Sequence, residues 1–524
     1  MLRPIVFLAS LGIACFALAP VVLDASDSDG IPFSITPGIE EVLESISADS
    51  LRGHLSFIAS DLLEGRDTPS AGLDIAAEYI AAQFRRAGLE PLGDDGYFQT
   101  AHWLLAEPNM SEFRLEFRTQ EYHLRILSSE VSFRLNSALN VAASEVFKLD
   151  YTDIKTLPEL TAAQIEGRVV LTEIPDFRRE DQSRWEGLYK QQLKFLTKLR
   201  QLKAALVVSV DRTSSSGKGS GPGQLVDPEN RGRSTEAETL PWVRVHNGDW
   251  IRVYDGLKLG PASLDVSLSI PQPDERPVKV RNVAGLLRGS DPELQKTCVL
   301  VSAHYDHVGA DRARQGDQIF NGANDDGSGT VSVIELAAAL SRLNERPKRS
   351  ILFLTVFGEE KGLLGSRFYL RHPLFPLEKT IANVNLEVLG RTDTSEGVEK
   401  DRASLTGFDY TDLGRVFQWA GKLAGIEVYR DERFSDAFYS RSDNLSFAEQ
   451  GIPAHTLCAV FLYPDLHKVS DHWDKIDYPN LLKINRTVAL ALLMVAGDIR
   501  EPRWNAANRK AERYQQIWRE RQKR

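Results

Sequence analysis

Cysteine is nearly absent from this chain. Only three cysteines occur among 524 residues, and the first, Cys15, lies in an apolar N-terminal stretch. Cys298 and Cys458 allow one disulfide at most, and their apolar, strand-like surroundings also suit buried free thiols. No Cys-x-x-Cys pair occurs, which excludes a zinc site built on thiolates.

The motifs of several common enzyme classes are also missing. The sequence has no G-x-S-x-G elbow, no H-E-x-x-H helix, no P-loop and no dinucleotide fingerprint. A formal charge of −10 argues against a nucleic-acid groove. The tail 499–524 is basic, and a solvated terminal helix accounts for that charge. What remains is a long globular chain with room for two or more folded units.

The N-terminus carries the longest apolar stretch. One cation, Arg3, precedes a mostly apolar run from Ile5 to Leu23. Residues 1–25 therefore predict a secretory signal and an exported protein, periplasmic or extracellular. The run is almost long enough to span a bilayer, so a retained N-terminal anchor is the competing interpretation. Lipidation of Cys15 is not favoured, because Gly12 stands where the lipidation motif has a leucine-like residue.

The sequence pattern changes along the rest of the chain and indicates separate regions. Residues 71–88 place apolar side chains three to four positions apart, which predicts an amphipathic helix that stops at Gly88. Residues 131–275 combine strand-like runs, a charged helical segment and the Gly-Ser loop 213–225. This combination predicts an inserted β-rich or α+β accessory domain over 131–275.

From Val278 onward, strand, loop and helix alternate. A helix is expected over 329–344, and four runs are continuously apolar, as buried parallel strands are: 297–303, 350–357, 380–386 and 452–461. This predicts an α/β fold with a mixed, largely parallel sheet flanked by helices. Ligands bind beyond the carboxyl ends of the strands in such sheets.

Histidine and carboxylate side chains stand at successive strand ends. Buried unpaired carboxylates are costly, so such a cluster requires cations. Nitrogen and oxygen ligands without sulfur favour zinc, with manganese or cobalt as alternatives. The candidates are His304, Asp306, His307, Asp325, Asp326, Glu359, Glu360, Glu387, His467, Asp471 and His472.

The ordered segments AHYDHVG, GANDDGSGT, FGEEKGLLGS, VNLEVLGR and HKVSD resemble the co-catalytic di-zinc exopeptidases of metallopeptidase family 28. The resemblance also takes in the leading segment IASDLLEGR. It implies the zinc exopeptidase fold, with residues 40–130 and 276–498 in one peptidase domain. The insert resembles the protease-associated domain found in that family.

Carried over position by position, the resemblance implies two Zn²⁺ ions. Asp325 is expected to bridge them. One ion would be completed by His304 and Glu387, and the other by Glu360 and His467. Position 387 is more often aspartate in the family, so the extra methylene of glutamate affects the geometry or affinity of its site.

The resemblance also implies the catalytic groups. Glu359 is the expected general base, acting on a hydroxide that bridges the metals, and Asp306 the carboxylate that orients His304. Neighbouring Glu359 and Glu360 would thus divide proton transfer and metal binding between them.

Other side chains compete for places in the site. His467 is preferred over His472 as a ligand because HKVSD matches the family there. His455 is expected to be a core histidine, whereas His307 either lines the pocket or packs beneath it. Asp326 is expected to hydrogen-bond locally at the helix entry. Tyr439 is expected to pack as an aromatic rather than donate to an oxyanion, and Arg441, Ser442 and Asp443 resemble a pocket edge.

The predicted function is an exported zinc-dependent aminopeptidase that acts on peptides. A carboxypeptidase or another amidohydrolase on the same site is the alternative enzyme. A non-catalytic, receptor-like relative is the alternative from another class, and the complete ligand set argues against it.

Overall fold

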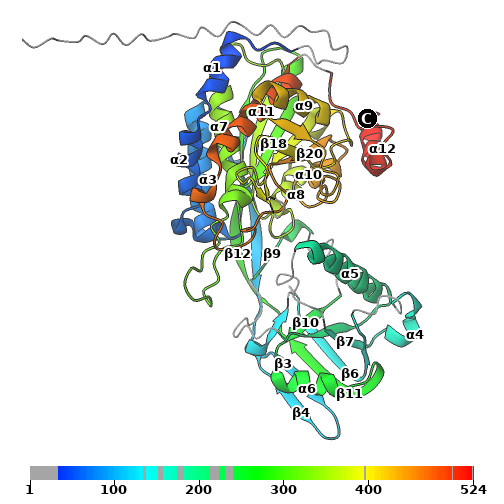
Figure 1. Ribbon diagram of the computed structural model, residues 1–524. Helices are drawn as coiled ribbons and strands as arrows, with labels where there is room; N and C mark the ends of the chain where they lie inside the picture. Colours follow the sequence, from blue (N-terminus) through cyan, green and yellow to red (C-terminus); the bar gives the residue numbers. More distant parts are fainter. Residues whose placement is uncertain are drawn as a thin grey trace, which may run out of the picture.

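The computed structural model describes residues 33–521 and 523, apart from 134–136, 152–156, 174–181, 213–222, 231–239, 395–396 and 498–499. The expected signal or anchor at residues 1–25 and most of the Gly-Ser loop lie outside the described residues. Two large sheets organise the described chain (Figure 1).

The larger sheet has ten strands, and its centre is parallel. β13, β14, β15 and β20 run parallel to one another, whereas β12, β2 and β9 extend the sheet in antiparallel fashion. The predicted mixed sheet is therefore present, with its parallel part confined mainly to the middle. In spatial order the strands are β19 (Glu427–Tyr429), β18 (Arg402–Leu405), β20 (Ala454–Cys458), β15 (Thr380–Leu386), β13 (Cys298–His304), β14 (Ser350–Val356), β12 (Asp274–Leu287), β2 (Phe98–Glu107) and β9 (Gln224–Val226), and β1 (Glu90–Pro91) pairs with β12.

Helices cover both faces of this sheet. Val299 and Val301 of β13 join the core on one face, and Leu300 between them joins the core on the other. Burial on both faces explains why β13, β14 and β15 read as unbroken apolar runs. One face packs against α1 (Pro37–Ser45), α2 (Ala48–Ile58), α3 (Ala71–Ala87), α7 (Ser328–Leu340), α9 (Leu413–Ala424) and α11 (Tyr478–Ala496), and the other against α8 (Leu364–Arg371), α10 (Asn444–Ala448) and α12 (Glu512–Arg521).

The helices and strands expected in and around the larger sheet are present within a few residues of their predicted bounds. The helix predicted over 71–88 is α3, and Gly88 ends it with a left-handed φ of 73°. The basic tail differs from the expectation of a solvated helix, because one face of α12 is docked. Tyr514 is buried there, and the indole of Trp504 donates a hydrogen bond to the carbonyl of Gly451 at 2.9 Å.

The second sheet has eight strands and its own core, in which Trp250 stacks on Phe117. It begins with β3 at Arg114, ahead of the expected boundary at 131, because β3 pairs with β11 rather than with the larger sheet. Its strands, in spatial order, are β4 (His123–Ile126), β3 (Arg114–Arg118), β11 (Gly260–Ile270), β6 (Leu139–Lys148), β7 (Val169–Glu173), β8 (Leu206–Val210), β10 (Trp242–Val245) and β5 (Val131–Phe133), with helices α4 (Ala162–Ile165), α5 (Gln182–Gln201) and α6 (Gly248–Gly256).

The long strands β2 and β12 and the short strand β9 lie where the chain passes between the two sheets (Figure 1). Within the described residues, no helix combines the length and apolar character needed to cross a membrane.

Candidate metal centre

The carboxyl ends of three neighbouring parallel strands deliver the polar side chains of the site. β13 ends at His304, β15 is followed directly by Glu387, and β14 is followed by Gly358 and the Glu359–Glu360 pair. Gly358 turns the chain there with a φ of 67°. Asp325 comes from the turn η8 (Ala323–Gly327) that leads into α7.

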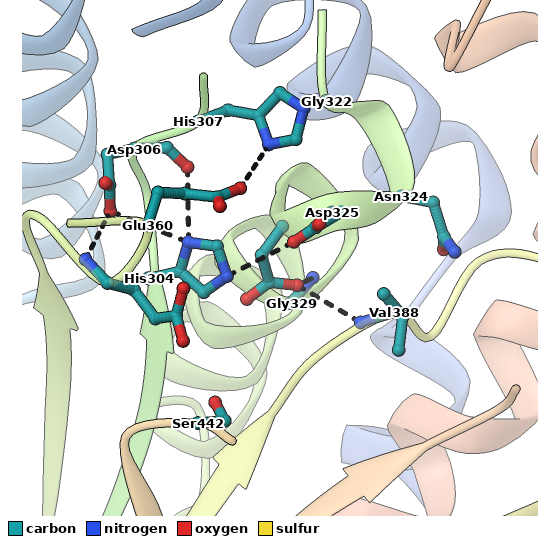
Figure 2. A network of polar contacts seen from close by, with 12 residues as sticks. His304, Asp306, His307, Gly322, Asn324, Asp325, Gly329, Glu360, Val388 and Ser442 are labelled. Atoms are coloured by element: carbon teal, nitrogen blue, oxygen red, sulfur yellow. Dashed lines mark hydrogen bonds and ion pairs between the residues drawn. The ribbon is translucent and has the colours of Figure 1, made fainter. Parts of the chain in front are cut away.

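Asp325 lies at the centre of the cluster (Figure 2). One carboxylate oxygen is 3.3 Å from Nε2 of His304, and the other is 3.0 Å from Nε2 of His467. Oε1 of Glu360 is 3.3 Å from the same His467 nitrogen. Asp325 therefore faces ligand candidates on two sides, as a bridging carboxylate would.

Two groups of side chains are close enough to hold metal ions, and Asp325 belongs to both. One group is His304, Asp325 and Glu387, and the other is His307, Asp325, Glu360 and His467. The structure thus brings together all five residues predicted as ligands and adds His307. Their roles as ligands remain predictions.

The buried donor atoms of the cluster fit a divalent cation. Among the described residues, Nε2 of His304, both ring nitrogens of His307 and Oε1 of Glu360 are buried and form no hydrogen bond of ordinary geometry. The close contacts of Nε2 of His304 and of Oε1 of Glu360 are ion pairs with other members of the cluster. Buried polar atoms without partners are costly. Imidazole nitrogens and carboxylate oxygens are the donors that zinc accepts, so the residues present suit this metal.

The electrostatics of the cluster favour positive charge. Burial opposes ionisation of Glu360, yet His467 and His307 lower its pKa to about 2. Burial likewise opposes protonation of His467, but Glu360 and Asp325 raise its pKa to about 11. The acidic side chains thus draw protons onto a histidine, which indicates a site suited to cations.

Glu359 and Glu360 differ in their relation to the candidate metal groups. Glu360 joins the second metal group, whereas Glu359 belongs to neither. The backbone N–H of Glu359 donates to Oδ1 of Asp306 at 3.1 Å. Burial raises the pKa of Glu359 well above its ordinary value, the Glu387 and Glu360 carboxylates add to the rise, and His304 opposes it.

Asp306 contacts His304 through two of its oxygens. Nδ1 of His304 is 3.2 Å from the backbone carbonyl of Asp306 and 3.6 Å from its carboxylate. The carbonyl is the nearer partner, which differs from the expected carboxylate contact. Since the carboxylate also accepts from Glu359, Asp306 links the candidate ligand to the candidate base.

The competing residues have other surroundings. His455 is a core histidine, with Nδ1 2.7 Å from the carbonyl of Thr406 and Nε2 2.6 Å from the hydroxyl of Thr411. His472 is partly exposed and pairs with Asp317 at 3.5 Å rather than joining the cluster. Both observations agree with the predictions.

Asp326 and Tyr439 also have the local roles expected of them. Asp326 accepts hydrogen bonds from the backbone N–H groups of Gly329 and Val388. Tyr439 is buried among aromatic rings and donates to the carbonyl of Ala454. At the expected pocket edge, Ser442 accepts from the amide of Asn385 at 2.8 Å, and Asp443 is buried and accepts from Ser366.

Two buried residues, Arg66 and the candidate Asp471, support the site through backbone contacts that the sequence did not predict. Arg66 is 0% exposed and donates to four backbone carbonyls, those of Ile58, Tyr305, Asn321 and Gly322. It thereby ties the loop after His304 to the segment before Asp325. Asp471 accepts from the backbone N–H groups of Asn324 and Asp325 and from the hydroxyl of Tyr463. Both residues lie in segments that carried the resemblance, IASDLLEGR and HKVSD, but a motif does not reveal hydrogen bonds between distant loops.

This sheet and its cluster of histidine and carboxylate side chains define a domain of the metallopeptidase class. Residues 282–492 match the model of Peptidase family M28, so the chain contains a domain of that family. The solved aminopeptidase from Aneurinibacillus sp. strain AM-1 has a TM-score of 0.55 at 18% identity, covering 87% of this chain and 95% of its own. A zinc aminopeptidase from Bacillus subtilis has a TM-score of 0.53 at 18% identity, covering 89% of this chain and 97% of its own. At these identities the likeness concerns the fold.

Curated relatives match shorter segments. A probable zinc metalloprotease of Pyricularia oryzae is 34% identical over 157 residues, 30% of this chain and 28% of that protein. A vacuolar membrane protease of Verticillium alfalfae is 40% identical over 92 residues, 18% of this chain and 8% of that protein. The matched segments therefore span less than a third of either relative.

These relatives correct the expected location. The sequence predicts an exported protein, periplasmic or extracellular, whereas several curated relatives are named for the vacuolar membrane. The prediction is wrong on this evidence. Its physical basis was weak, because an apolar run such as Ile5–Leu23 can direct a chain to a membrane without specifying which one.

Proposed function

We propose that the chain is a zinc-dependent aminopeptidase with two Zn²⁺ sites that share Asp325. The single observation that supports this most is the position of Asp325, whose two oxygens face His304 and His467 at 3.3 and 3.0 Å. One ion would be held by His304, Asp325 and Glu387, and the other by Asp325, Glu360 and His467. When bound, zinc polarises a substrate carbonyl and lowers the pKa of water.

Glu359 would move the proton in this reaction. Its carboxyl lies beside the cluster without belonging to either metal group, and burial keeps its pKa well above the ordinary value. Glu359 would take a proton from the attacking water and deliver it to the leaving amine. Asp306 would hold the backbone of Glu359 and the ring of His304 in place.

The partly buried members of an apolar cluster next to Glu387 in the chain would contact the substrate's first side chain. Val388 of this cluster directly follows Glu387, and Leu466 directly precedes His467. The aromatic members of the cluster would suit a bulky apolar side chain. The cluster consists of Val388, Cys458, Val460, Phe461 and Tyr463, with Phe434, Phe438, Leu462 and Leu466 packed against it.

The charges around the site favour an aminopeptidase over a carboxypeptidase. A carboxypeptidase needs a cation for the substrate's carboxylate, but two cations close to the site already pair with carboxylates of the protein. Arg391 binds Asp465 at 2.8 Å and also pairs with Asp393, and Lys361 lies 2.9 Å from Asp67. The excess of carboxylates at the site instead suits a substrate's ammonium group.

The test compares leucine anilide with its N-acetylated form at equal concentration. The proposal predicts hydrolysis of the free-amine substrate and little hydrolysis of the blocked one. A C-terminally free, N-blocked peptide serves as the carboxypeptidase probe. Preferential hydrolysis of that probe would contradict the aminopeptidase assignment while leaving the metal site intact.

We also propose that the second sheet forms a protease-associated-type domain. Its support is a separate core around Trp250 and a chain path that leaves and re-enters the larger sheet through β2 and β12. On this interpretation the domain spans β3 to β11, and the peptidase domain comprises the chain on either side of it.

A further inference from the structure

His307 is a fully buried histidine that no part of the proposed mechanism uses. Its side chain is 0% exposed, and its backbone N–H donates to the carbonyl of Arg66 at 3.2 Å. The ring packs against the backbone of Gly322, where an added Cβ would lie 2.5 Å from the ring's Cγ. The glycine thus leaves room for the imidazole, and the surrounding chain fixes its position.

The ring nitrogens of His307 differ from those of the other buried histidines. In His455, both nitrogens lie within 2.7 Å of a threonine oxygen, and Nδ1 of His54 lies 2.8 Å from the hydroxyl of Tyr79. Neither nitrogen of His307 forms a hydrogen bond of ordinary geometry among the described residues, and the close contact of Nδ1 is with Oε1 of Glu360, itself a ligand candidate. A buried imidazole whose Nε2 has no hydrogen-bond partner is costly, which favours a ligand role for this ring.

The neighbours of His307 are metal-ligand candidates. Its Nδ1 lies 2.8 Å from Oε1 of Glu360 (Figure 2). Its ring centroid is 5.4 Å from that of His467. One donor atom from each of His307, Asp325, Glu360 and His467 falls within 4.8 Å of the others. Zinc bonds of about 2.0–2.1 Å in tetrahedral geometry separate ligand atoms by roughly 3.4 Å. Three contacts within this group are 2.8, 3.0 and 3.3 Å, somewhat shorter than that separation.

We propose that His307 is a sixth metal ligand, so that the two zinc sites are unequal. His307, Asp325, Glu360 and His467 supply four protein ligands to one ion, whereas His304, Asp325 and Glu387 supply three to the other. Zinc sites with four protein ligands are typically closed and retain their metal, and sites with three keep a position open. This inference rests on the proposed function, because it assigns a ligand within the proposed zinc centre.

The unequal ligand counts predict unequal affinities. The site with four side chains should bind zinc more tightly and lose it last during dialysis against a chelator. The site with three side chains should exchange its metal more readily and keep a position for water or substrate.

The experiment measures zinc binding to metal-stripped full-length protein by titration calorimetry, with metal analysis after dialysis. The variants are His307→Ala, His307→Asp and the control His455→Ala. His307→Asp supplies a carboxylate ligand in place of the imidazole. For His307→Ala we expect one site to weaken by at least about 100-fold while the other keeps its affinity. His307→Asp should recover part of the loss, and His455→Ala should bind as the wild type does.

The outcomes separate the inference from the proposed function. Two zinc ions bound by His307→Ala with wild-type affinities would overturn the inference alone. A wild-type protein that binds no zinc would overturn the proposed function as well. If His307→Ala loses both ions, His307→Asp decides: recovery of two ions supports the ligand role, and continued loss of both contradicts it.

Discussion

At the scale of single residues, two adjacent carboxylates of the site differ in their surroundings. Glu359 and Glu360 follow the same strand, yet only Glu360 joins a group that could hold a metal. The turn at Gly358 lies just before the pair and ends the regular alternation of the strand. Adjacent carboxylates can therefore divide metal binding and proton transfer.

Substitution of each glutamate tests this division. Glu359→Gln should retain zinc and lose about 10²–10⁴-fold in kcat, because it removes a general base and no ligand. Glu360→Gln should lose zinc from one site as well as activity. Metal content and kcat are measured on the same preparations. Equal zinc content and equal residual activity in the two variants would refute the division.

Arg66 acts on the site through the loops that carry the ligands. Lysine in its place cannot reach all four carbonyls, so Arg66→Lys should destabilise the protein by at least about 2 kcal/mol and weaken zinc binding. Arg349→Lys is the matched control. Arg349 is 6% exposed and donates to carbonyls at the end of α11, next to the start of β14 rather than its carboxyl end.

Both variants are measured by denaturant unfolding and zinc titration. Both should lose stability, but only Arg66→Lys should lose zinc affinity. A similar change in zinc affinity in both variants would mean that the effect of Arg66 is general destabilisation.

At the scale of secondary-structure elements, sequence periodicity predicted the peptidase unit well. Strands buried on both faces have continuous apolar runs, and α3 has a clear apolar stripe with a glycine stop. The boundary of the second sheet was less predictable, because β3 and β4 alternate buried and exposed residues whichever sheet they join. Pairing partners far apart in sequence decide that boundary, as they do for β9.

Substitution by alanine is expected to have opposite effects on stability at two glycines in helical regions. Gly88 ends α3 at a φ of 73°, whereas Gly53 is exposed within α2, and an added Cβ meets nothing within 4 Å at either position. Gly88→Ala should destabilise by about 1–2 kcal/mol from backbone strain alone. Gly53→Ala should stabilise by up to about 1 kcal/mol. Unfolding midpoints check both, and destabilisation by Gly53→Ala would contradict the account of α2.

Strand β20 carries His455, whose protonation would destabilise the folded protein. Burial lowers the pKa of His455 to about 4, against an ordinary value of 6.5. Below pH 6.5 the unfolded chain binds a proton that the folded protein does not, so stability falls as the pH drops from 6.5 toward 4. Between pH 7.5 and 5 this residue should account for about 2 kcal/mol of lost stability.

His455→Gln tests this pH dependence, since glutamine does not titrate. The variant will be less stable than the wild type at pH 7.5, but the difference between them should shrink by pH 5. Urea unfolding at both pH values measures the change. A constant difference across the range would contradict the assignment to His455.

At the scale of the whole molecule, the fold and the grouping of the candidate residues could be predicted, but the hydrogen bonds between distant loops could not. His304, Glu360 and Glu387 lie together because parallel strands present their carboxyl ends at one edge, and loops bring Asp325 and His467 to them. His307 remained ambiguous, because a histidine that lines a site and one that packs beneath it look alike in a sequence. The contacts of Arg66 join segments about 240 to 256 residues apart, which no local pattern reveals.

The central claim is that this centre needs zinc for peptide hydrolysis. The most direct measurement strips the full-length protein with a chelator, returns zinc in steps, and follows zinc bound per chain together with leucine-anilide hydrolysis. The account predicts that activity disappears on stripping, returns as zinc is bound, and reaches its maximum at two ions per chain. Full activity in protein that retains no metal would contradict it.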